Sequence, residues 1–350
     1  VLVSLFGLYA VFLLVSRLAN RRAAALATLV CATCPQYAMI SRQSITDLPF
    51  TALLTAALSF FLLGLHAEED EAPRAHTFRV ADRSLTVSTF HVFSAVLLLV
   101  TVPQLLLLAL DIGPAFGRSI PLGGGHLRLG GLPYALPWLA LLGFYFVSTL
   151  STGARSARHT YIHIAWMLAG LAVLAKGLGG ILVPAAIVGL YLLLLRDPAL
   201  LARIELLRGL ALFLLVAAPW HHGMWIRHGQ AFWGEYFVHH HLKRAQAGVH
   251  GERGSFEYFV HQLGIGMFPW TGLVPLAVLR AVGLAGEPRT KRDRLVLFTL
   301  VWALVAFGLF ALMETKFHHY ALPAIPPLAI LIGVMLDEAL EDRRPALVIG

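Results

Sequence analysis

The stretch TFHVFSAVLLLVTVPQLLLLAL, residues 89–110, decides the fold because it contains no Asp, Glu, Lys or Arg. A helix needs roughly 20 mostly apolar residues to span a hydrocarbon core of about 30 Å. Comparable stretches recur at about residues 1–16, 23–38, 48–65, 133–152, 159–175, 178–195, 207–222, 262–283, 295–313 and 321–338, and another begins near Pro345. They are too long and too continuously apolar for barrel strands. The sequence therefore predicts an all-α fold, a polytopic transmembrane helical bundle of about 11–12 spans.

The composition supports this fold class. Apolar residues make up 58% of the 350 residues and charged residues 13%, and the mean hydropathy is +0.75. A soluble domain of this size would expose more polar surface. The net charge is +8, but the charges lie in short loops between apolar spans, which argues against a nucleic-acid partner. Cys31 and Cys34 lie in an apolar stretch, so we interpret them as packed small residues rather than a disulfide or redox motif.

The basic residues predict an orientation, because loops rich in Lys and Arg stay in the cytoplasm. Alternate loops carry most of them: Arg17, Arg21, Arg22, Arg74, Arg79, Arg83, Arg155, Arg158, Arg196, Arg203, Arg208, Arg280, Arg289, Lys291, Arg292, Arg294, Arg343 and Arg344. Residues 66–88 then form a charged cytoplasmic loop, and glycine-rich residues 112–132 form an outer connector. Residues 219–262 form the longest outer stretch, whose tryptophans, aromatics and histidines predict amphipathic helices in the membrane interface, so we expect a periplasmic interfacial loop here.

Four clusters on the predicted outer side carry residues suited to chemistry. Arg42 and Asp47 lie in the first, where Asp47 is also expected to serve as a helix N-cap before Pro49. Lys176 lies in the second, a tight turn in which a lysine could equally extend to the surface for structural reasons. The remaining two clusters contain His240, His241, Lys243 and Arg244, and Lys316, His319 and Tyr320.

These clusters together predict a site for an anionic head group that stays attached to a lipid. Arg, Lys and Tyr side chains can bind phosphate oxygens, and a carboxylate can serve as general base. On an α-helix, His240 and Arg244 would share one face. A metal site is the less favoured interpretation of the histidine run, since adjacent helical residues point in different directions. A divalent metal, with His240 as the best candidate ligand, stays open as an alternative, and we predict no certain cofactor.

Four segments, in this order, resemble the C-type superfamily of membrane glycosyltransferases. They are CPQYAMISRQSITDLPFTALLT (34–55), LAKGLGG (174–180), HHHLKRAQAGVHGERG (239–254) and ETKFHHYALPAIPPLAIL (314–331). The resemblance covers most of residues 1–60 and 160–340. It is closest to the bacterial branch that includes lipid A aminoarabinose transferases and relatives of protein O-mannosyltransferases. No single segment is strongly specific, but the ordered set is fairly specific.

This resemblance implies an inverting glycosyl transfer from a polyprenyl-phosphate-linked sugar on the periplasmic face of the bacterial inner membrane. The acceptor would be lipid A, another glycolipid or a protein. Asp47 matches the family's acidic residue in the second outer loop, and His240 or His241 with Arg244 matches its histidine–arginine pair. Lys316 and Tyr320 match the lysine and tyrosine before the LPxxPP run, where the tyrosine contacts the carrier phosphate.

The sequence departs from the family in two respects. The family's first outer loop, with its main catalytic aspartate, would precede Val1, and residues 66–135 form an enlarged connection. We therefore expect a single transmembrane glycosyltransferase domain over 1–350 that is truncated at its N-terminus. A transporter or flippase for an anionic lipid or sugar is the alternative, although charges at one surface and the lack of repeated halves count against it. A non-catalytic membrane scaffold is the third interpretation.

Overall fold

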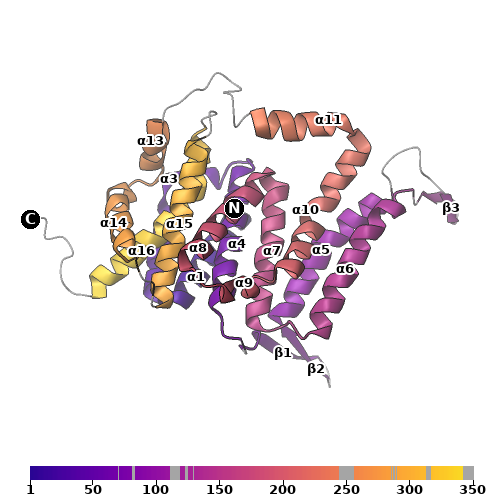
Figure 1. Ribbon diagram of the computed structural model, residues 1–350, viewed down its shortest axis with the longest axis horizontal. Helices are drawn as coiled ribbons and strands as arrows, with labels where there is room; N and C mark the ends of the chain where they lie inside the picture. Colours follow the sequence, from indigo (N-terminus) through magenta and orange to yellow (C-terminus); the bar gives the residue numbers. More distant parts are fainter. Residues whose placement is uncertain are drawn as a thin grey trace, which may run out of the picture.

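The computed structural model describes residues 1–69, 71–80, 83–110, 119–122, 125–128, 130–243, 256–284, 286, 288, 290–312 and 317–341. Helices make up almost all of these residues, so the all-α prediction is confirmed (Figure 1). The helices are α1 (Leu2–Leu18), α2 (Arg21–Thr33), α3 (Pro35–Ile40), α4 (Asp47–His66), α5 (Thr89–Leu110), α6 (Leu132–Ser151), α7 (Ala157–Lys176), α8 (Gly179–Leu195), α9 (Ala199–Arg203), α10 (Leu206–His228), α11 (Gln230–Phe232), η1 (Trp233–Lys243), α13 (Phe256–Gly266), η2 (Trp270–Leu273), α14 (Val274–Leu284), α15 (Lys291–Ala311), η3 (His318–Ala324) and α16 (Ile325–Glu341).

Six helices among the described residues are long and apolar enough to cross a membrane, namely α4, α5, α6, α10, α15 and η3 with α16. The shorter helices α1 and α8 are also apolar. The protein is therefore a multi-pass membrane protein. The span predicted at about 262–283 falls on a bent helix pair, α13 and the helix over Trp270–Leu284, which together are apolar enough to cross a membrane but are bent by 116°. The span predicted near Pro345 lies outside the described residues.

The core of the bundle is built around α4. This helix packs along α7 and α1, and α16 packs along α2. In both α4 and the span ending in α16, 89% of the apolar window is buried. Helices α16 and α2 approach each other closely at Gly333, because this residue has no side chain. An added Cβ there would lie only 2.4 Å from the backbone nitrogen of Ala27. Central helices are apolar on every side because they contact only other helices.

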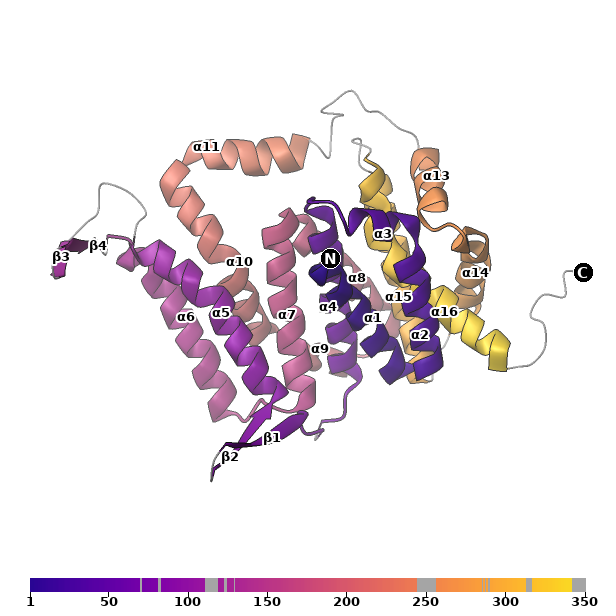
Figure 2. The same cartoon turned by 180° about the vertical axis from the view of Figure 1, so that it is seen from behind.

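Helices α5 and α6 form an antiparallel hairpin at the periphery, beside α10 and α7 (Figure 2). Only 33% of the α5 window and 17% of the α6 window is buried. Most of their apolar side chains therefore face the surrounding lipid. The long segment between α4 and α7 thus leaves the core and returns to it.

Both connecting segments contain a pair of antiparallel strands. Residues 66–88 contain a β-hairpin of β1 (Ala75–Val80) and β2 (Arg83–Ser88), which pairs Ala75 with Ser88 and Val80 with Arg83. The outer connector contains β3 (Ser119–Leu122) and β4 (Gly125–Arg128). In both connectors, local antiparallel pairing satisfies the backbone polar groups.

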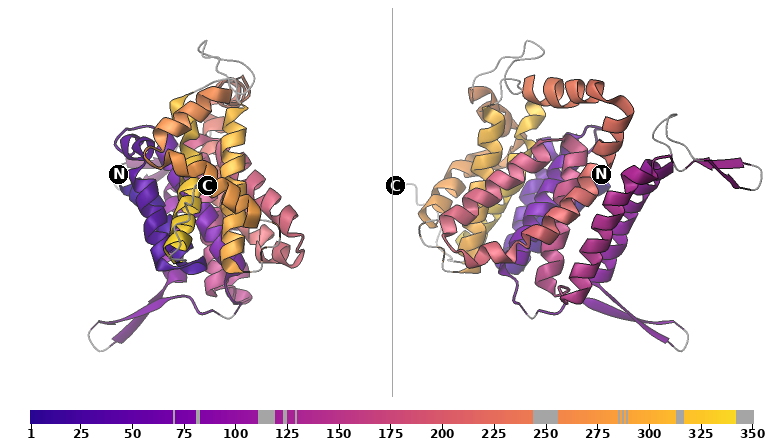
Figure 3. Two further views of the ribbon diagram at one scale, coloured as in Figure 1. Left: turned by 90° about the vertical axis from the view of Figure 1, so that its left-hand side faces the viewer. Right: turned by 45° about the vertical axis from the view of Figure 1, so that its right-hand side comes forward.

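The bundle has two distinct ends. One end carries the start of α4 and the end of α7, and we call it the Asp47 end; η1 lies across it (Figure 3). The other carries the β1–β2 hairpin and the start of α10, and we call it the Glu205 end (Figure 3). The segment predicted as an interfacial loop is largely helical, since α10 reaches His228 and is followed by α11 and η1.

Candidate functional site

Asp47 is the first residue of α4 and lies nearly buried at the Asp47 end. The N-cap is Thr46, and no side-chain hydrogen bond caps the helix, so the prediction that Asp47 is the N-cap is wrong. A carboxylate in the first helical turn interacts favourably with the helix dipole. Because the Asp47 side chain caps no backbone group, its oxygens are available to other side chains.

Lys176 forms an ion pair with Asp47 across 129 positions of the sequence. It is the last residue of α7, and Gly177 ends that helix with a φ of 62°, a conformation that favours glycine. The side chains of Asp47 and Lys176 are 9% and 19% exposed. Both residues were predicted from the sequence as site residues, but Lys176 was predicted to bind phosphate, and its ion pair with Asp47 was not predicted.

Three aromatic rings surround the Lys176 ammonium group. Its nitrogen lies 4.5 Å from the centre of the Tyr320 ring and 5.6 Å from the centres of the Phe50 and Phe310 rings. Cation–π contacts of this kind attract a cation and are strongest where water is excluded. Phe50 and Phe310 were not predicted from the sequence, because nothing distinguishes them from other phenylalanines in apolar spans.

His319 approaches Asp47 from a third segment of the chain. Its Nε2 atom lies 3.6 Å from Oδ2 of Asp47, and its ring stacks on Phe317 with centroids 5.2 Å apart. The backbone is held by Gln36, which donates a hydrogen bond to the carbonyl of His318. The turn η3 therefore presents His319 and Tyr320 together, as the sequence cluster predicted.

The other predicted residues are less well placed. Arg42 is exposed in the turn between α3 and α4 and forms no ion pair with another described residue. His240, His241 and Lys243 lie in η1, whose side chains at these positions are outside the description. Arg244 and Lys316 lie outside the described residues. The described part of this segment, Trp233–Lys243, is a π-helix, whose residue spacing differs from that of an α-helix.

The described residues offer no metal site. No group of three or more His, Cys, Asp or Glu side chains among them is arranged to hold an ion. At the candidate site Asp47 and His319 provide two donors, but the Lys176 ammonium already occupies one Asp47 oxygen. Two donors and a competing cation do not fit a divalent metal. A metal ligand from the η1 histidines stays a prediction.

An apolar groove of about 450 Å³ begins beside the site. It is lined by α4, α7, α8 and α10, with Phe61, Trp166, Val188 and Phe213 among its walls. Its upper margin is Gly180, and the neighbouring Gly179 lies against Phe50, whose ring faces Lys176. The groove thus comes nearest to the charged cluster at Gly180 and runs along α8 towards Ile204 at the Glu205 end, and no charged residue of the Asp47 cluster lines it.

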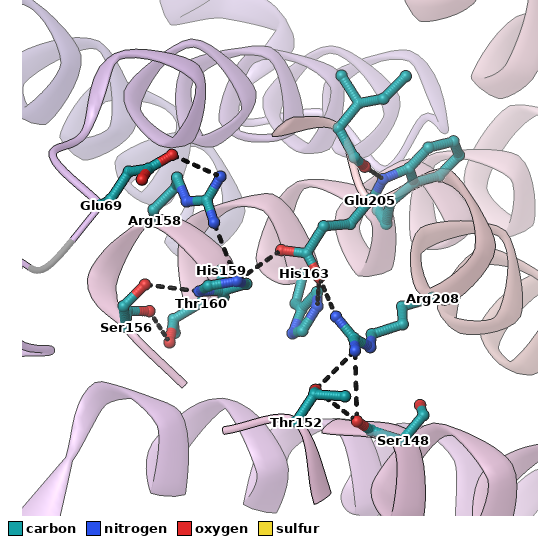
Figure 4. A network of polar contacts seen from close by, with 12 residues as sticks. Glu69, Ser148, Thr152, Ser156, Arg158, His159, Thr160, His163, Glu205 and Arg208 are labelled. Carbon is teal, nitrogen blue, oxygen red and sulfur yellow. Dashed lines mark hydrogen bonds and ion pairs between the residues drawn. The ribbon is translucent and has the colours of Figure 1, made fainter. Parts of the chain in front are cut away.

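A second polar network lies at the Glu205 end, and the sequence did not predict it (Figure 4). Glu205 accepts a 2.9 Å hydrogen bond from Arg208 and lies 3.2 Å from Nε2 of the fully buried His163. His163 contacts the Tyr145 hydroxyl at 3.0 Å, and Arg208 donates to Thr152. The only sequence signal was the spacing of His159 and His163, one helical turn apart. The prediction that charged groups gather at one surface is therefore incomplete.

Comparisons with known proteins support the resemblance described above. The chain matches no family model. It is 29% identical over 207 residues to the undecaprenyl phosphate-alpha-4-amino-4-deoxy-L-arabinose arabinosyl transferase of Pseudomonas aeruginosa, covering 58% of this chain and 35% of that protein. It is 27% identical over 210 residues to the transferase of the same name from Aeromonas hydrophila, covering 59% and 37%. The matched segment thus spans little more than a third of these relatives.

The fold is also that of a solved transferase. The crystal structure of ArnT from Cupriavidus metallidurans bound to undecaprenyl phosphate superposes with a TM-score of 0.65 at 22% identity, over 96% of this chain and 44% of that one. Its apo form gives a TM-score of 0.63. This chain is therefore similar in sequence to the aminoarabinose transferases and shares their helical fold.

Proposed function

We propose that the protein is a glycosyltransferase that moves a sugar from a polyprenyl-phosphate carrier to a membrane acceptor, with inversion. The reaction takes place at the Asp47 end, facing the periplasm in the bacterial inner membrane. One observation carries the proposal: Asp47, Lys176 and the His319–Tyr320 pair, from three distant segments, meet at one end of a membrane bundle beside an apolar groove. This arrangement suits a substrate with a charged head and a long apolar tail.

The groove is suited to the isoprenoid tail of the carrier. Its walls are apolar, and its upper margin adjoins the aromatic rings around Lys176. A carrier whose phosphate lies near Lys176 could extend its first isoprene units along α8. Burial of these units would contribute about 25 cal/mol per Å² of apolar surface. The phosphate would then be held at a fixed height in the membrane.

Lys176 can exchange partners during the reaction. Without donor, its ammonium group is paired with Asp47. A donor phosphate next to the Tyr320 ring would compete for this cation, and the bridging oxygen gains negative charge as the glycosidic bond breaks. Movement of Lys176 towards the phosphate would leave the Asp47 carboxylate to accept a proton. Donor binding would thereby activate the base.

The chemical step is a single displacement. An acceptor hydroxyl or amine attacks the anomeric carbon and forms a new bond, while the bond from that carbon to the phosphate oxygen breaks. The electron pair leaves with polyprenyl phosphate, and the acceptor's proton passes to Asp47. His319, 3.6 Å from Asp47, is placed to orient the carboxylate. Attack from the side opposite the leaving group inverts the anomeric centre.

The relatives suggest the substrate class. The proteins from Pseudomonas aeruginosa and Aeromonas hydrophila are named for undecaprenyl phosphate-linked 4-amino-4-deoxy-L-arabinose. We extend this class of donor to the protein, with lipid A or a similar glycolipid as acceptor and a protein acceptor as the alternative.

A transfer assay tests the proposal. The protein, in liposomes, is given undecaprenyl phosphate carrying a labelled aminopentose, and lipid A or a peptide mixture as acceptor. We expect a glycosylated lipid, detected by mass spectrometry, that Asp47→Asn does not form. Movement of labelled lipid between leaflets without any glycosylated product would instead identify a flippase and refute the proposal.

A further inference from the structure

In the sequence, the α5–α6 hairpin stands between α4 and α7, the two helices that pack most extensively against each other in the described part of the chain. Helices α4 and α7 pack along each other, and residues 67–156 leave this interface between them and return to it. The hairpin contributes nothing to the Asp47 cluster directly. Its packing partners are instead α10 and, to a smaller extent, α7. Since α10 leads directly into α11 and η1, the hairpin is connected to the helix that lies over the site (Figure 2).

The hairpin is fixed at the Glu205 end by the polar network of Figure 4. Arg208 of α10 donates to the Thr152 hydroxyl at 2.6 Å and to the Ser148 carbonyl at 3.3 Å, both on α6 or directly after it. Tyr145 of α6 contacts His163 of α7, which in turn faces Glu205. The Tyr145–His163 contact in this network is buried, so a rotation of α6 that broke it would leave buried polar groups unsatisfied, whereas the Arg208–Thr152 contact is exposed.

The hairpin is also fixed to α10 at the Asp47 end. Trp138 of α6 donates from Nε1 to Nδ1 of His222 at 3.0 Å. The His222 ring also meets the edge of Tyr134, with centroids 5.9 Å apart. Because Nδ1 of His222 accepts this bond, the neutral ring carries its proton on Nε2. Both ends of α6 therefore hold α10.

The preceding residue of α10, His221, holds η1. His221 lies with Nδ1 2.7 Å from the Ala217 carbonyl, which can only accept, so the proton is on Nδ1. Its Nε2 atom therefore accepts from the Tyr236 hydroxyl at 3.1 Å. Burial raises the pKa of Tyr236, which keeps this hydroxyl protonated at neutral pH. Phe232 stacks on the Tyr236 ring at 5.1 Å.

We propose that the α5–α6 hairpin is a brace that positions η1 over the Asp47 end through the sequence of contacts Trp138–His222, His221–Tyr236. Trp138 and His222 are positioning residues that touch no reacting group. The two histidines are neighbours on α10, so a shift of one moves the other. The geometric part of this proposal stands alone; its consequence for donor binding rests on the proposed function.

A distance measurement tests the geometry. Spin labels are attached at Glu235→Cys on η1 and Leu312→Cys at the end of α15, two exposed positions. The native Cys31 and Cys34 are buried, so labelling is selective. We expect one narrow distance distribution, which broadens or shifts in Trp138→Phe and in His222→Leu. His222→Asn, which keeps an acceptor near the Nδ1 position, should restore it, and Leu136→Ala on the lipid-facing side of α6 should leave it unchanged.

Kinetics of the unlabelled variants test the consequence. Trp138→Phe should raise the donor KM by roughly two- to tenfold, the factor expected for one lost hydrogen bond, with kcat nearly unchanged. An unaltered distance distribution in both Trp138→Phe and His222→Leu would overturn the brace. An altered distribution with an unaltered KM would overturn its role in donor binding. A wild-type protein that transfers no sugar would refute the proposed function, while the distance measurement would still decide the brace.

Discussion

At the scale of single residues, the proposed mechanism assigns Asp47 the role of general base and Lys176 that of phosphate ligand. Neutral variants of similar shape separate the two roles. We expect Asp47→Asn to lower kcat by at least about a hundredfold, because the general base is lost, and to lower the donor KM, because the carboxylate no longer competes with the phosphate for Lys176. Lys176→Gln should mainly raise the donor KM, because a phosphate partner is lost. Steady-state transfer kinetics check this, and equal effects of both variants on kcat alone would contradict the partner exchange.

Tyr320 has two properties that can be separated by substitution. Its ring lies under the Lys176 ammonium, and its hydroxyl is predicted to contact the carrier phosphate. Tyr320→Phe keeps the ring and should raise the donor KM about tenfold or less, as for a charged hydrogen bond. Tyr320→Leu removes both properties and should have a larger effect. If wild type and Tyr320→Phe bound undecaprenyl phosphate with equal affinity, the hydroxyl would be excluded as a ligand of the carrier phosphate.

At the scale of helices, Glu205 holds α10 to α7 and α6. Burial on its own would raise the pKa of Glu205, but the hydrogen bond and charge of His163 and the hydrogen bond of Arg208 outweigh it, and the pKa is lowered. A lowered pKa means that the folded state favours the carboxylate. The contribution to stability is therefore present at neutral pH and is lost as the pH falls through the lowered pKa.

Glu205→Gln should therefore lower Tm by several degrees at pH 7, since it leaves Arg208 and His163 without their counter-charge. The difference from wild type should persist down to about pH 5 and shrink below about pH 4, under the usual carboxyl range. Thermal unfolding in detergent across this pH range measures both effects. Glu257→Gln, at an exposed position of α13, serves as the control and should leave Tm unchanged. A pH-independent difference would show that the charge of Glu205 does not stabilise the junction.

The elements that could be predicted from the sequence are those with a strong local signal. Long apolar runs identify helices such as α5 because only helices satisfy the backbone in lipid. The bend between α13 and α14 falls at Pro269, a helix-breaking residue that the prediction of a span at 262–283 did not use, whereas the π-helical form of η1 left no such signal. Similarly, Asp47 and Lys176 could be named as polar residues at span ends. Their pairing could not be predicted, since it depends on how α4 and α7 align.

At the scale of the whole molecule, the bundle combines a tightly packed core with a lightly packed hairpin. The core brings together Asp47, Lys176 and His319, and the hairpin packs beside α10. The solved transferase structure superposes over 96% of this chain, so most of the α5–α6 hairpin belongs to the shared fold rather than being an insertion of this chain. The hairpin leaves the bundle at the end where α4 stops, packs on the outside and returns to the same end, where α7 begins.

The orientation of the whole molecule can be tested with two single-cysteine positions at opposite ends. Glu235 on η1 and Asp197 before α9 are both exposed, and Asp197 lies near Arg196, Arg203 and the other basic residues of the Glu205 end. Basic loops are retained in the cytoplasm. We therefore expect a membrane-impermeant maleimide to label Glu235→Cys in intact spheroplasts and Asp197→Cys only after permeabilisation.

The native thiols do not interfere, because Cys31 and Cys34 are buried. The reversed pattern would place the Asp47 cluster in the cytoplasm, where the carrier would have to present its sugar on the inner leaflet. Transfer to an acceptor on the periplasmic side would then be impossible without a separate flipping step. Because the charge pattern and the Asp47 cluster are independent features of the chain, this labelling result decides between a periplasmic and a cytoplasmic enzyme whatever the identity of the sugar.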